Sequence, residues 1–536
     1  MPETRSWQVR WRSAGQSAQR TVRRSARYAV SSARKVTGSA RSVWRSAPKQ
    51  RRQTWRLTAG STVVGLAVAA GAVATAGPWD SGQRTAERSR AAAQGRTGGE
   101  HHAGPVLSAA PVLAPLGGPV RDGNAHGVTP PAPQALADAL TPLLDDPSLG
   151  TLRTASVVDV ATGRELFGSR PDRAATPAST VKLATAAAAL SALGPDHRVE
   201  TRVVEGARRS GPPEIVLVGG GDPTLTARAS QANPDESAPD PSPDQPASLR
   251  TLADDTARTL KQRGTAEVRL AYDATAFSGP LQHPIGPNEN IATISPLMAD
   301  EGRLDATDHG PAPRTADPAA TAAQTFAGLL RDRGIKITEA PAAAKAPTGP
   351  TRLAAVRSLP VASMVERMLT NSDNDIAESL ARLTALGTGE PASFEGAHKA
   401  VRKTLTTLGL PLTGAVFEDG SGLDRDDRVT ARLLSRILVL AAAPDHPELR
   451  PILTGLPVAS FTGTLRDRYT DRASGAGAVR AKTGTLTGVN TLAGTVVDTN
   501  GRLLAFAFMS TAAPDGPTAQ STLDHLATTL TTCTCH

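Results

Sequence analysis

The chain is poor in cysteine and in aromatic residues, and both shortages limit how it can be built. Its only two cysteines, Cys533 and Cys535, lie within the last four of 536 residues, so no disulfide can staple a core. With His536 they offer three metal ligands where a structural zinc site needs about four, and a frayed terminus explains them as well. We therefore predict no metal and no cofactor. Because aromatics make up 3% of the chain, its core must pack small side chains and bring backbones close together.

Three signatures of catalysis or nucleotide binding are also missing. The chain has no G-x-S-x-G elbow and no H-E-x-x-H, so α/β-hydrolases and zinc peptidases lack support. The glycine-rich "GGGDPT" at 219–224 is not followed by G-K-[ST] and is therefore not a P-loop.

Positive charge is concentrated at the N-terminus. Residues 1–57 hold 15 of the 59 basic residues and one of the 50 acidic residues, which leaves 44 bases and 49 acids elsewhere. The net charge of +9 therefore belongs to a tail, and the body of the chain is mildly acidic. An acidic body argues against nucleic-acid binding, so no nucleic acid is expected as a partner.

A long uncharged run follows this tail at residues 57–79. Its 23 residues are enough to cross a bilayer as a helix. Because basic residues precede it, the positive-inside rule places the disordered tail 1–56 in the cytoplasm and the body outside. We predict a single-pass signal anchor in the cell membrane. Small residues around "AVATA" leave cleavage and secretion as the alternative.

The composition and the residue pattern of the rest of the chain change several times. A stretch rich in Ala, Gly, Pro and Arg predicts a flexible linker. Helix-like and strand-like segments follow, ending in three strands, with a turn at Asn500–Gly501 between the last two, and a final helix. The middle alternates short strands with helices, which predicts an α/β (α+β) fold in which one domain interrupts another. The predicted boundaries are 80–133 for the linker, 134–205 and 346–530 for the split domain, 206–345 for the insert, 227–248 for a disordered acidic loop within it and 531–536 for a tail.

The stretch "PASTVKLATAAAAL", residues 177–190, places a serine and a lysine three residues apart. Good helix formers follow, so Ser179 is predicted at a helix N-terminus with Lys182 one turn on, within reach of its hydroxyl. The chain has nine lysines against 50 arginines, and only lysine can lose its proton and act as a base. An N-capping serine beside a solvated lysine has the same spacing. S-x-x-K also occurs at Ser32 and Ser46 in the basic tail.

A second motif, "NSDN", contains the only S-x-N of the chain, Ser372 and Asn374. It predicts a turn between helices that presents a hydroxyl and an amide on one side. An ordinary Asx turn is the alternative.

A third motif, "AKTGT", contains the only K-T-G. On an edge-type strand, Gly484 would let a ligand backbone approach closely. The hydroxyls of Thr483 and Thr485 would hold a carboxylate, and Lys482 would supply positive charge. An ordinary strand is the alternative.

The three motifs stand in the order S-x-x-K, S-x-N, K-T-G, the triple of serine β-lactamases and penicillin-binding proteins. With "GGGDPTL", "EDGSGLDRDDRVT" and "LPVASFTGTLRDR", the chain from about 133 to 528 resembles the D-alanyl-D-alanine carboxypeptidase/endopeptidases among the low-molecular-mass penicillin-binding proteins. That group carries a domain inserted between the first two motifs. The resemblance implies a penicillin-recognising, serine transpeptidase/β-lactamase-like domain, an antiparallel sheet flanked by helices and interrupted by an α/β insert.

The resemblance also implies a mechanism. Ser179 would attack the D-Ala-D-Ala bond of peptidoglycan stem peptides with Lys182 as its base, and Ser372 and Lys482 would pass a proton to the departing D-Ala. The backbone N–H groups of Ser179 and Thr485 would hold the oxyanion. β-Lactam antibiotics would acylate the same serine as inhibitors. The substrate-binding residues would be Asn374, Lys482, Thr483, Gly484 and Thr485.

Two other functions stay open from the sequence. A β-lactamase or an esterase on the same fold would use the same serine. A non-catalytic, membrane-anchored cell-wall-binding or sensor protein would keep the fold without turnover.

Overall fold

The computed structural model describes residues 131–208, 210–229, 245–470 and 475–532. Within these ranges no helix is both long enough and apolar enough to cross a membrane. The predicted segments that lie wholly or mostly outside the described residues are the tail 1–56, the anchor 57–79, the linker 80–133, the acidic loop 227–248 and the terminal tail 531–536.

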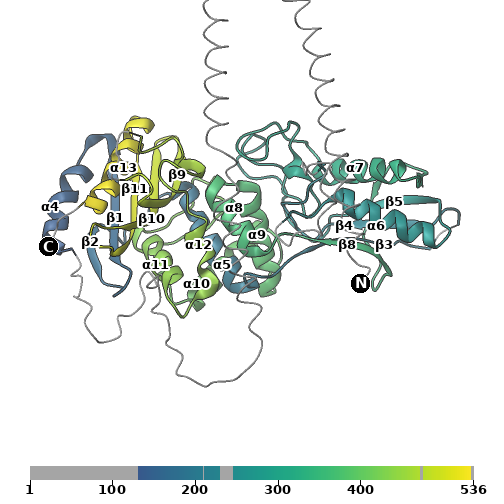
Figure 1. The fold of residues 1–536 in the computed structure, drawn as a ribbon, viewed down its shortest axis with the longest axis horizontal. Helices are drawn as coiled ribbons and strands as arrows, with labels where there is room; N and C mark the ends of the chain where they lie inside the picture. The colour runs from purple at the N-terminus through teal and green to yellow at the C-terminus, as the bar shows by residue number, and fades with distance from the viewer. Residues whose placement is uncertain (1–130, 209, 230–244, 471–474, 533–536) are drawn as a thin grey trace, which may run out of the picture. The chain divides into compact units, whose positions relative to one another are not determined.

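The first sheet joins the two ends of the described chain. All of its pairings are antiparallel, in the order β2-β1-β11-β10-β9. β1 and β11 pair from Leu152↔Thr511 to Asp159↔Leu504, and the predicted turn at Asn500–Gly501 joins β10 to β11. The strands are β1 (Leu152–Asp159), β2 (Glu165–Ser169), β9 (Val479–Leu486), β10 (Val489–Val497) and β11 (Leu503–Thr511) (Figure 1).

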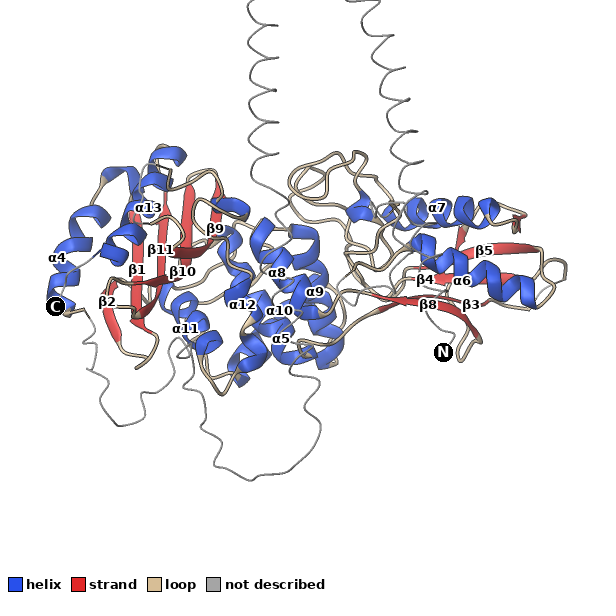
Figure 2. Cartoon of the chain, viewed as in Figure 1, coloured by secondary structure: helices blue, strands red, loops and turns tan. Residues whose placement is uncertain are grey.

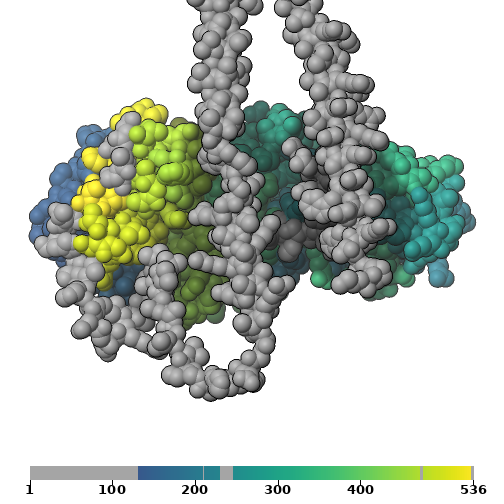
Figure 3. All heavy atoms as spheres, in the orientation of Figure 1, coloured from purple at the N-terminus to yellow at the C-terminus, as the bar shows by residue number. Residues whose placement is uncertain are grey.

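Side chains alternate across β11 and separate two parts of the core. One face packs against α4 (Pro133–Leu144) and α13 (Gly516–Thr532), which also contact each other. Figure 3 shows the blue atoms from the start of the described chain beside the yellow atoms from its end. The opposite face packs against α11 (Ala431–Ala442). This alternation is the two-residue period of a strand that is covered on both sides. The first face holds Leu504, Phe506 and Phe508, and the second holds Ala505, Ala507 and Met509.

Several helices, α11 among them, surround α5 (Lys182–Leu193). The first nine residues of α5 are all buried, and five of them are alanine, so its neighbours can pack closely against it. Figure 2 shows this group of blue helices next to the red strands of the first sheet. The helices that contact α5 besides α11 are α8 (Val361–Asn371), α9 (Asn374–Thr388), α10 (Phe394–Thr407) and α12 (Pro451–Thr454).

A second sheet lies between the first two motifs in the sequence. Its order is β6-β5-β4-β3-β8, with β7 beside β5. The pairs β3/β4 and β3/β8 are antiparallel, whereas β5 runs parallel to β4, β6 and β7. α6 and α7 share a hydrophobic core with this sheet. The elements are β3 (Glu200–Glu205), β4 (Glu214–Val218), α6 (Leu249–Gln262), β5 (Glu267–Asp273), α7 (Pro318–Asp332), β6 (Lys336–Ile337), β7 (Ala342–Ala343) and β8 (Arg352–Arg357).

This second sheet extends past the limits of 206 and 345 that the sequence predicted for the insert. β3 and β8 belong to it, because the chain pairs with itself where it leaves the helices and where it returns, from Glu200↔Arg357 to Val204↔Arg352. The two strands satisfy each other's backbone groups, which a boundary drawn from local composition does not register.

Residues 274–317, between β5 and α7, are mostly irregular and contain one short 3₁₀ helix, Asp300–Gly302. We call them the returning segment, because they run back to the helices around α5. The Ser278 N–H donates to Ala392 O at 3.0 Å, for example. Irregular segments of this length in compact domains are usually either functional or linkers, and this one packs against the helices.

Candidate active site

Ser179 lies on a short 3₁₀ helix, Ala178–Val181, that leads directly into α5. The α-helix therefore begins three residues after Ser179 and not at it, which corrects the predicted helix start. The turn is held in place by two threonines, since the hydroxyls of Thr180 and Thr491 both donate to Pro177 O at 2.7 Å.

Lys182 is fully buried, and its amine faces three acceptors. Nζ lies 2.9 Å from Ser179 Oγ, 2.7 Å from Asn374 Oδ1 and 2.5 Å from Ser421 O. Burial lowers the pKa of Lys182 to about 8, against the charges of nearby acids, of which Asp419 raises it most. The alternative of a solvated lysine is therefore wrong, and the amine is suited to take up a proton near neutral pH.

Lys482 and Ser372 form a second amine–hydroxyl pair. Lys482 Nζ lies 2.8 Å from Ser372 Oγ and also donates to Thr483 O at 2.7 Å. Burial, and then the charge of Lys182, hold the pKa of Lys482 well below its usual range. Ser372 follows α8 in the left-handed conformation, with φ 59° and ψ 38°, so it occupies the predicted turn between two helices.

Asn374 opens α9, which Asp373 caps by accepting from Ile376 N at 3.0 Å. The Asn374 side chain is held at both ends: Oδ1 accepts from Lys182, and Nδ2 donates to Asn290 O at 2.9 Å. An amide nitrogen carries two protons, so Nδ2 can also donate to a substrate carbonyl. The returning segment thus helps to orient a predicted substrate-binding residue.

Gly484 lies on β9, the edge strand, where it faces the Ser179 turn. A Cβ at this position would stand 2.2 Å from Thr491 Oγ1, 2.7 Å from Pro177 O and 3.1 Å from Ser179 N. We expected this glycine to admit a ligand backbone. Instead it admits the turn of the chain itself that carries Ser179, which brings β9 against the candidate nucleophile.

The neighbouring threonines of β9 have partners outside the motif. Thr483 Oγ1 lies 2.8 Å from Thr464 Oγ1, and Thr485 Oγ1 lies 3.4 Å from Gln520 Nε2 on α13. The Thr485 side chain stands on the exposed side of the strand. Both hydroxyls therefore lie along the edge that borders the site.

A cleft of about 230 Å³ opens at this edge. Four of the predicted residues line it, while Lys182, Lys482, Thr483 and Gly484 are buried. All eight predicted residues thus belong to one neighbourhood. The residues of the cleft include Ser179, Ser372, Asn374 and Thr485, together with Leu423 and, from the returning segment, Asn290, Arg303, Gly310, Pro311 and Arg314.

The sequence did not reveal several groups that complete the site. Two are backbone carbonyls, Ser421 O and Asn290 O, and a carbonyl belongs to every residue, so no residue type signals it. A third is the buried ion pair between Arg314 and Asp375, 2.8 Å apart, which ties the returning segment to α9. Gly422 could have been noticed, because its "DGSGLD" context is typical of a tight turn, and the structure gives it a φ of +82°, which glycine adopts readily.

Two groups of acidic residues, one with a histidine, lie close enough to share an ion among the described residues, but cations of the protein already occupy them. Arg382 lies 3.4 Å from Glu378 in the first group. Arg303 lies 2.8 Å from Glu301 in the second, and we assign a metal to neither. Desolvation, then the charges of the neighbouring carboxylates, raises the pKa of Glu301 to about 9. The groups are His283, Glu378 and Asp419, and Glu301, Asp373 and Asp375.

The site therefore unites a hydroxyl with a buried amine of lowered pKa, a second amine–hydroxyl pair, and an edge strand beside both. A neutral amine can take the proton of Ser179 while its oxygen attacks a carbonyl carbon, which is the first step of acyl-enzyme chemistry. Fold and site define a serine enzyme of the penicillin-recognising class. The profile of the D-Ala-D-Ala carboxypeptidase 3 (S13) family matches residues 136–309 and 305–530, and the chain belongs to this family. The resemblance stated from the motifs is confirmed.

Known proteins are similar to this chain over about three quarters of its length. A carboxypeptidase of Mycobacterium tuberculosis is 38% identical over 413 residues, covering 76% of this chain and 85% of that protein. Carboxypeptidase DacB of Mycolicibacterium smegmatis is 37% identical over the same length, with the same coverage. The structure of penicillin binding protein 4 of Haemophilus influenzae matches with a TM-score of 0.58 at 21% identity, covering 74% of this chain and 98% of that one. Its complex with a β-lactam matches with a TM-score of 0.54, at the same identity and coverage.

Proposed function

We propose that this chain is a serine D-Ala-D-Ala carboxypeptidase/endopeptidase that cleaves peptidoglycan stem peptides through a Ser179 acyl-enzyme. The observation that carries the proposal is the 2.9 Å contact between the buried Lys182 amine and Ser179 Oγ. With a pKa of about 8, roughly a tenth of these amines are neutral at pH 7 and ready to act as a base.

In the acylation step, Lys182 removes the Ser179 proton as Oγ bonds to the carbonyl carbon of the penultimate D-Ala. The oxyanion lies between the backbone N–H groups of Ser179 and Thr485, and one such donor is typically worth about 3 kcal/mol. The close approach of β9 to the Ser179 turn at Gly484 supports this pairing of donors.

The C–N bond then breaks, and the departing D-Ala nitrogen needs a proton. Ser372 and Lys482 deliver it, since Lys482 Nζ already donates to Ser372 Oγ at 2.8 Å. Water afterwards attacks the ester carbon and frees Ser179. In this scheme Asn374 holds the substrate amide, and the terminal carboxylate lies between Thr483 and Thr485.

A β-lactam follows the same first step, but its leaving nitrogen stays tethered, so release from Ser179 is slow. The β-lactam complex of the Haemophilus influenzae protein supports this part of the proposal. β-Lactams are therefore proposed as inhibitors and peptidoglycan as the substrate.

Two measurements test the proposal. Release of D-Ala from diacetyl-Lys-D-Ala-D-Ala is expected from the wild type and not from Ser179→Ala. Mass spectrometry after exposure to penicillin should show a stable adduct on the wild type only. A wild-type chain without adduct, or an adduct of equal yield on Ser179→Ala, contradicts the assignment. Rapid turnover of a chromogenic cephalosporin would favour a β-lactamase instead.

We further propose that residues 57–79 anchor the chain in the membrane, with the basic tail 1–56 inside and the peptidase outside. The uncharged run and the basic residues before it support this topology. The chain should resist alkaline extraction from membranes, and protease added to spheroplasts should digest the body. A mature chain in the medium that begins after "AVATA" would contradict the anchor and support cleavage.

A further inference from the structure

The loop between α10 and α11 supplies one of the three acceptors of the candidate base. Ser421 O accepts from Lys182 Nζ at 2.5 Å and lies 3.4 Å from Ser179 Oγ. The loop passes very close to the nucleophile, because a Cβ on Gly422 would stand 2.0 Å from Ala178 O. This carbonyl serves the site only while the loop keeps its shape.

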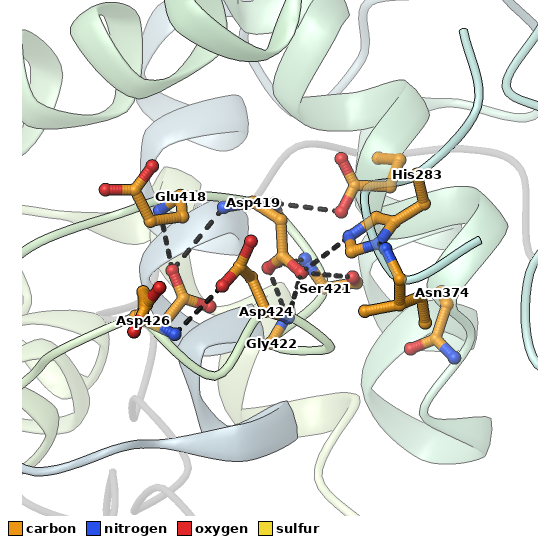
Figure 4. A network of polar contacts seen from close by, with 12 residues as sticks. His283, Asn374, Glu418, Asp419, Ser421, Gly422, Asp424 and Asp426 are labelled. Atoms are coloured by element: carbon orange, nitrogen blue, oxygen red, sulfur yellow. Dashed lines mark hydrogen bonds and ion pairs between the residues drawn. The ribbon is translucent and has the colours of Figure 1, made fainter.

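Asp419 holds that shape from inside the loop. Its carboxylate accepts from the N–H groups of Ser421 at 2.9 Å, Gly422 at 2.5 Å and Asp424 at 2.7 Å, and from the Ser421 hydroxyl at 3.1 Å. Its side chain is completely buried. Burial alone would raise the pKa of Asp419, but the hydrogen bond from His283 and the loop donors hold it below its usual range. Figure 4 shows the carboxylate between the loop and His283.

His283 comes from the returning segment and completes this arrangement. Its Nε2 lies 2.9 Å from Asp419 Oδ2, and its Nδ1 accepts from Ile285 N at 3.3 Å. An Nδ1 that accepts an N–H carries no proton, so the ring is the neutral tautomer whose Nε2–H donates to Asp419. The ring is 1% exposed and stands edge-on to Phe394, which leaves it little freedom to turn away.

We infer that His283 is a positioning residue for acylation: by donating to Asp419, it keeps the Ser421 carbonyl against Lys182 and Ser179. The returning segment is then part of the active site although it carries none of the three motifs. This inference rests on the proposed Ser179 chemistry. It assigns His283 an effect on the rate of acylation and little effect on ligand binding.

The charge of Asp419 gives the inference a second consequence. Among the acids that oppose the effect of burial on the pKa of Lys182, Asp419 contributes most, so removing its charge should lower this pKa further. Burial lowers the pKa of His283, while Asp419 and nearby acids raise it. A second proton on the ring would have to displace the Ile285 N–H that Nδ1 accepts. The charged groups around His283 are Asp419, Glu378 and Asp424, and those around Lys182 are Asp419, Asp373, Glu378, Asp427 and Lys482.

The first test compares two amide substitutions in the full chain. The side chain of His283→Gln can place a donor near the position of Nε2. His283→Asn, one methylene shorter, can still accept from Ile285 N but cannot reach Asp419. We expect His283→Asn to slow acylation by penicillin roughly tenfold with an unchanged dissociation constant for the non-covalent complex, and His283→Gln to recover most of the rate. The control is His446→Gln, a half-buried histidine that pairs with Glu448 at 2.9 Å and should acylate like the wild type.

Equal rates for all four folded chains, or equal losses for His283→Asn and His283→Gln, would overturn the inference. If the His283 variants do not fold, Asp419→Asn decides. Its acylation rate should rise at a lower pH than that of the wild type, by about one pH unit, because Lys182 loses the charge that favours its protonated form. An acylation rate equal to that of the wild type at every pH contradicts the inference. A wild type that forms no adduct would instead refute the proposed function itself.

Discussion

The two buried lysines of the site are chemically the same residue in two different surroundings. Lys182 faces two side-chain oxygens and a carbonyl, and the charges of four acids act on it. Lys482 donates to Ser372 Oγ and Thr483 O, and the charge that acts on it most is the positive charge of Lys182. Burial lowers the pKa of both, but the acids oppose this effect at Lys182 and keep its pKa at about 8, whereas the charge of Lys182 lowers the pKa of Lys482 in addition to burial.

The difference indicates two roles. An amine with a pKa near 8 can accept a proton during acylation and give it up again at neutral pH. Burial and the charge of Lys182 disfavour a proton on Lys482, whereas a substrate carboxylate that enters the cleft would favour the positive charge that we predicted for it. The nearby acids thus separate a base from a carboxylate-responsive group.

The strongest test of the difference between Lys182 and Lys482 is to replace each of them by arginine. Arginine keeps a positive charge but cannot act as a base. Lys182→Arg should slow acylation by penicillin ~1000-fold, within the range of general-base effects. Lys482→Arg should lose at least tenfold less activity, because it keeps the charge that faces the substrate carboxylate and loses only the proton delivery through Ser372. Equal losses in stopped-flow acylation would remove the distinction between the two.

The next largest effect is expected at the hydroxyl beside Lys482. Ser372→Ala removes the atom between this amine and the leaving group, so the kcat for D-Ala release should fall ~100-fold. Ser379→Ala is a matched control, because Ser379 Oγ is buried on α9 and has no hydrogen-bond partner among the described residues. Similar kcat values for the two variants would argue against a proton relay through Ser372.

The pH dependence of acylation should report the protonation of Lys182. The base works in its neutral form, so the rate should rise with pH and level off above about 8, the pKa of Lys182. From pH 8 to pH 6 the neutral fraction, and hence the rate, should fall about 50-fold. A rate that stays flat from about pH 6 to about pH 9 would contradict the base assignment.

The smallest effect is expected at Thr464, which supports Thr483 next to Lys482 through a contact of 2.8 Å. Thr464→Val keeps the volume and removes this hydrogen bond, worth about 1 kcal/mol. The KM for a D-Ala-D-Ala peptide should rise about fivefold with little change in kcat. Thr406→Val, exposed on α10, should leave both constants unchanged. A changed kcat would mean that Thr464 acts on the chemistry and not on carboxylate binding.

The part of the site that could be predicted consists of side chains whose type is chemically rare. Of the two abundant cationic residue types only lysine can act as a base, and nine lysines against 50 arginines made Lys182 and Lys482 conspicuous. The order of the motifs then indicated the family, and the resemblance to this family implied the antiparallel sheet.

The rest could not be predicted, because it depends on contacts between distant segments. Asp419 and His283 meet across 136 positions, and nothing local to either residue shows the contact. The turn at Ser179 became a 3₁₀ helix because threonines from two elements hold Pro177 O. The second sheet exceeded its predicted limits for the same reason: β3 and β8 find each other only in three dimensions.

The pairing of β3 with β8 has a consequence for how such a chain could have evolved. Glu200 and Arg357 are paired, so the inserted stretch of about 150 residues begins and ends at nearly the same place on the domain that carries the three motifs. Gain or loss of a sheet at such a point disturbs the path of the host chain little. The domain that carries the three motifs nevertheless depends on the inserted segment, because His283, Asn290 and Arg314 contact Asp419, Asn374 and Asp375. A lineage that shed this sheet would keep a foldable framework and would have to recruit new supports for Asp419, Asn374 and Asp375.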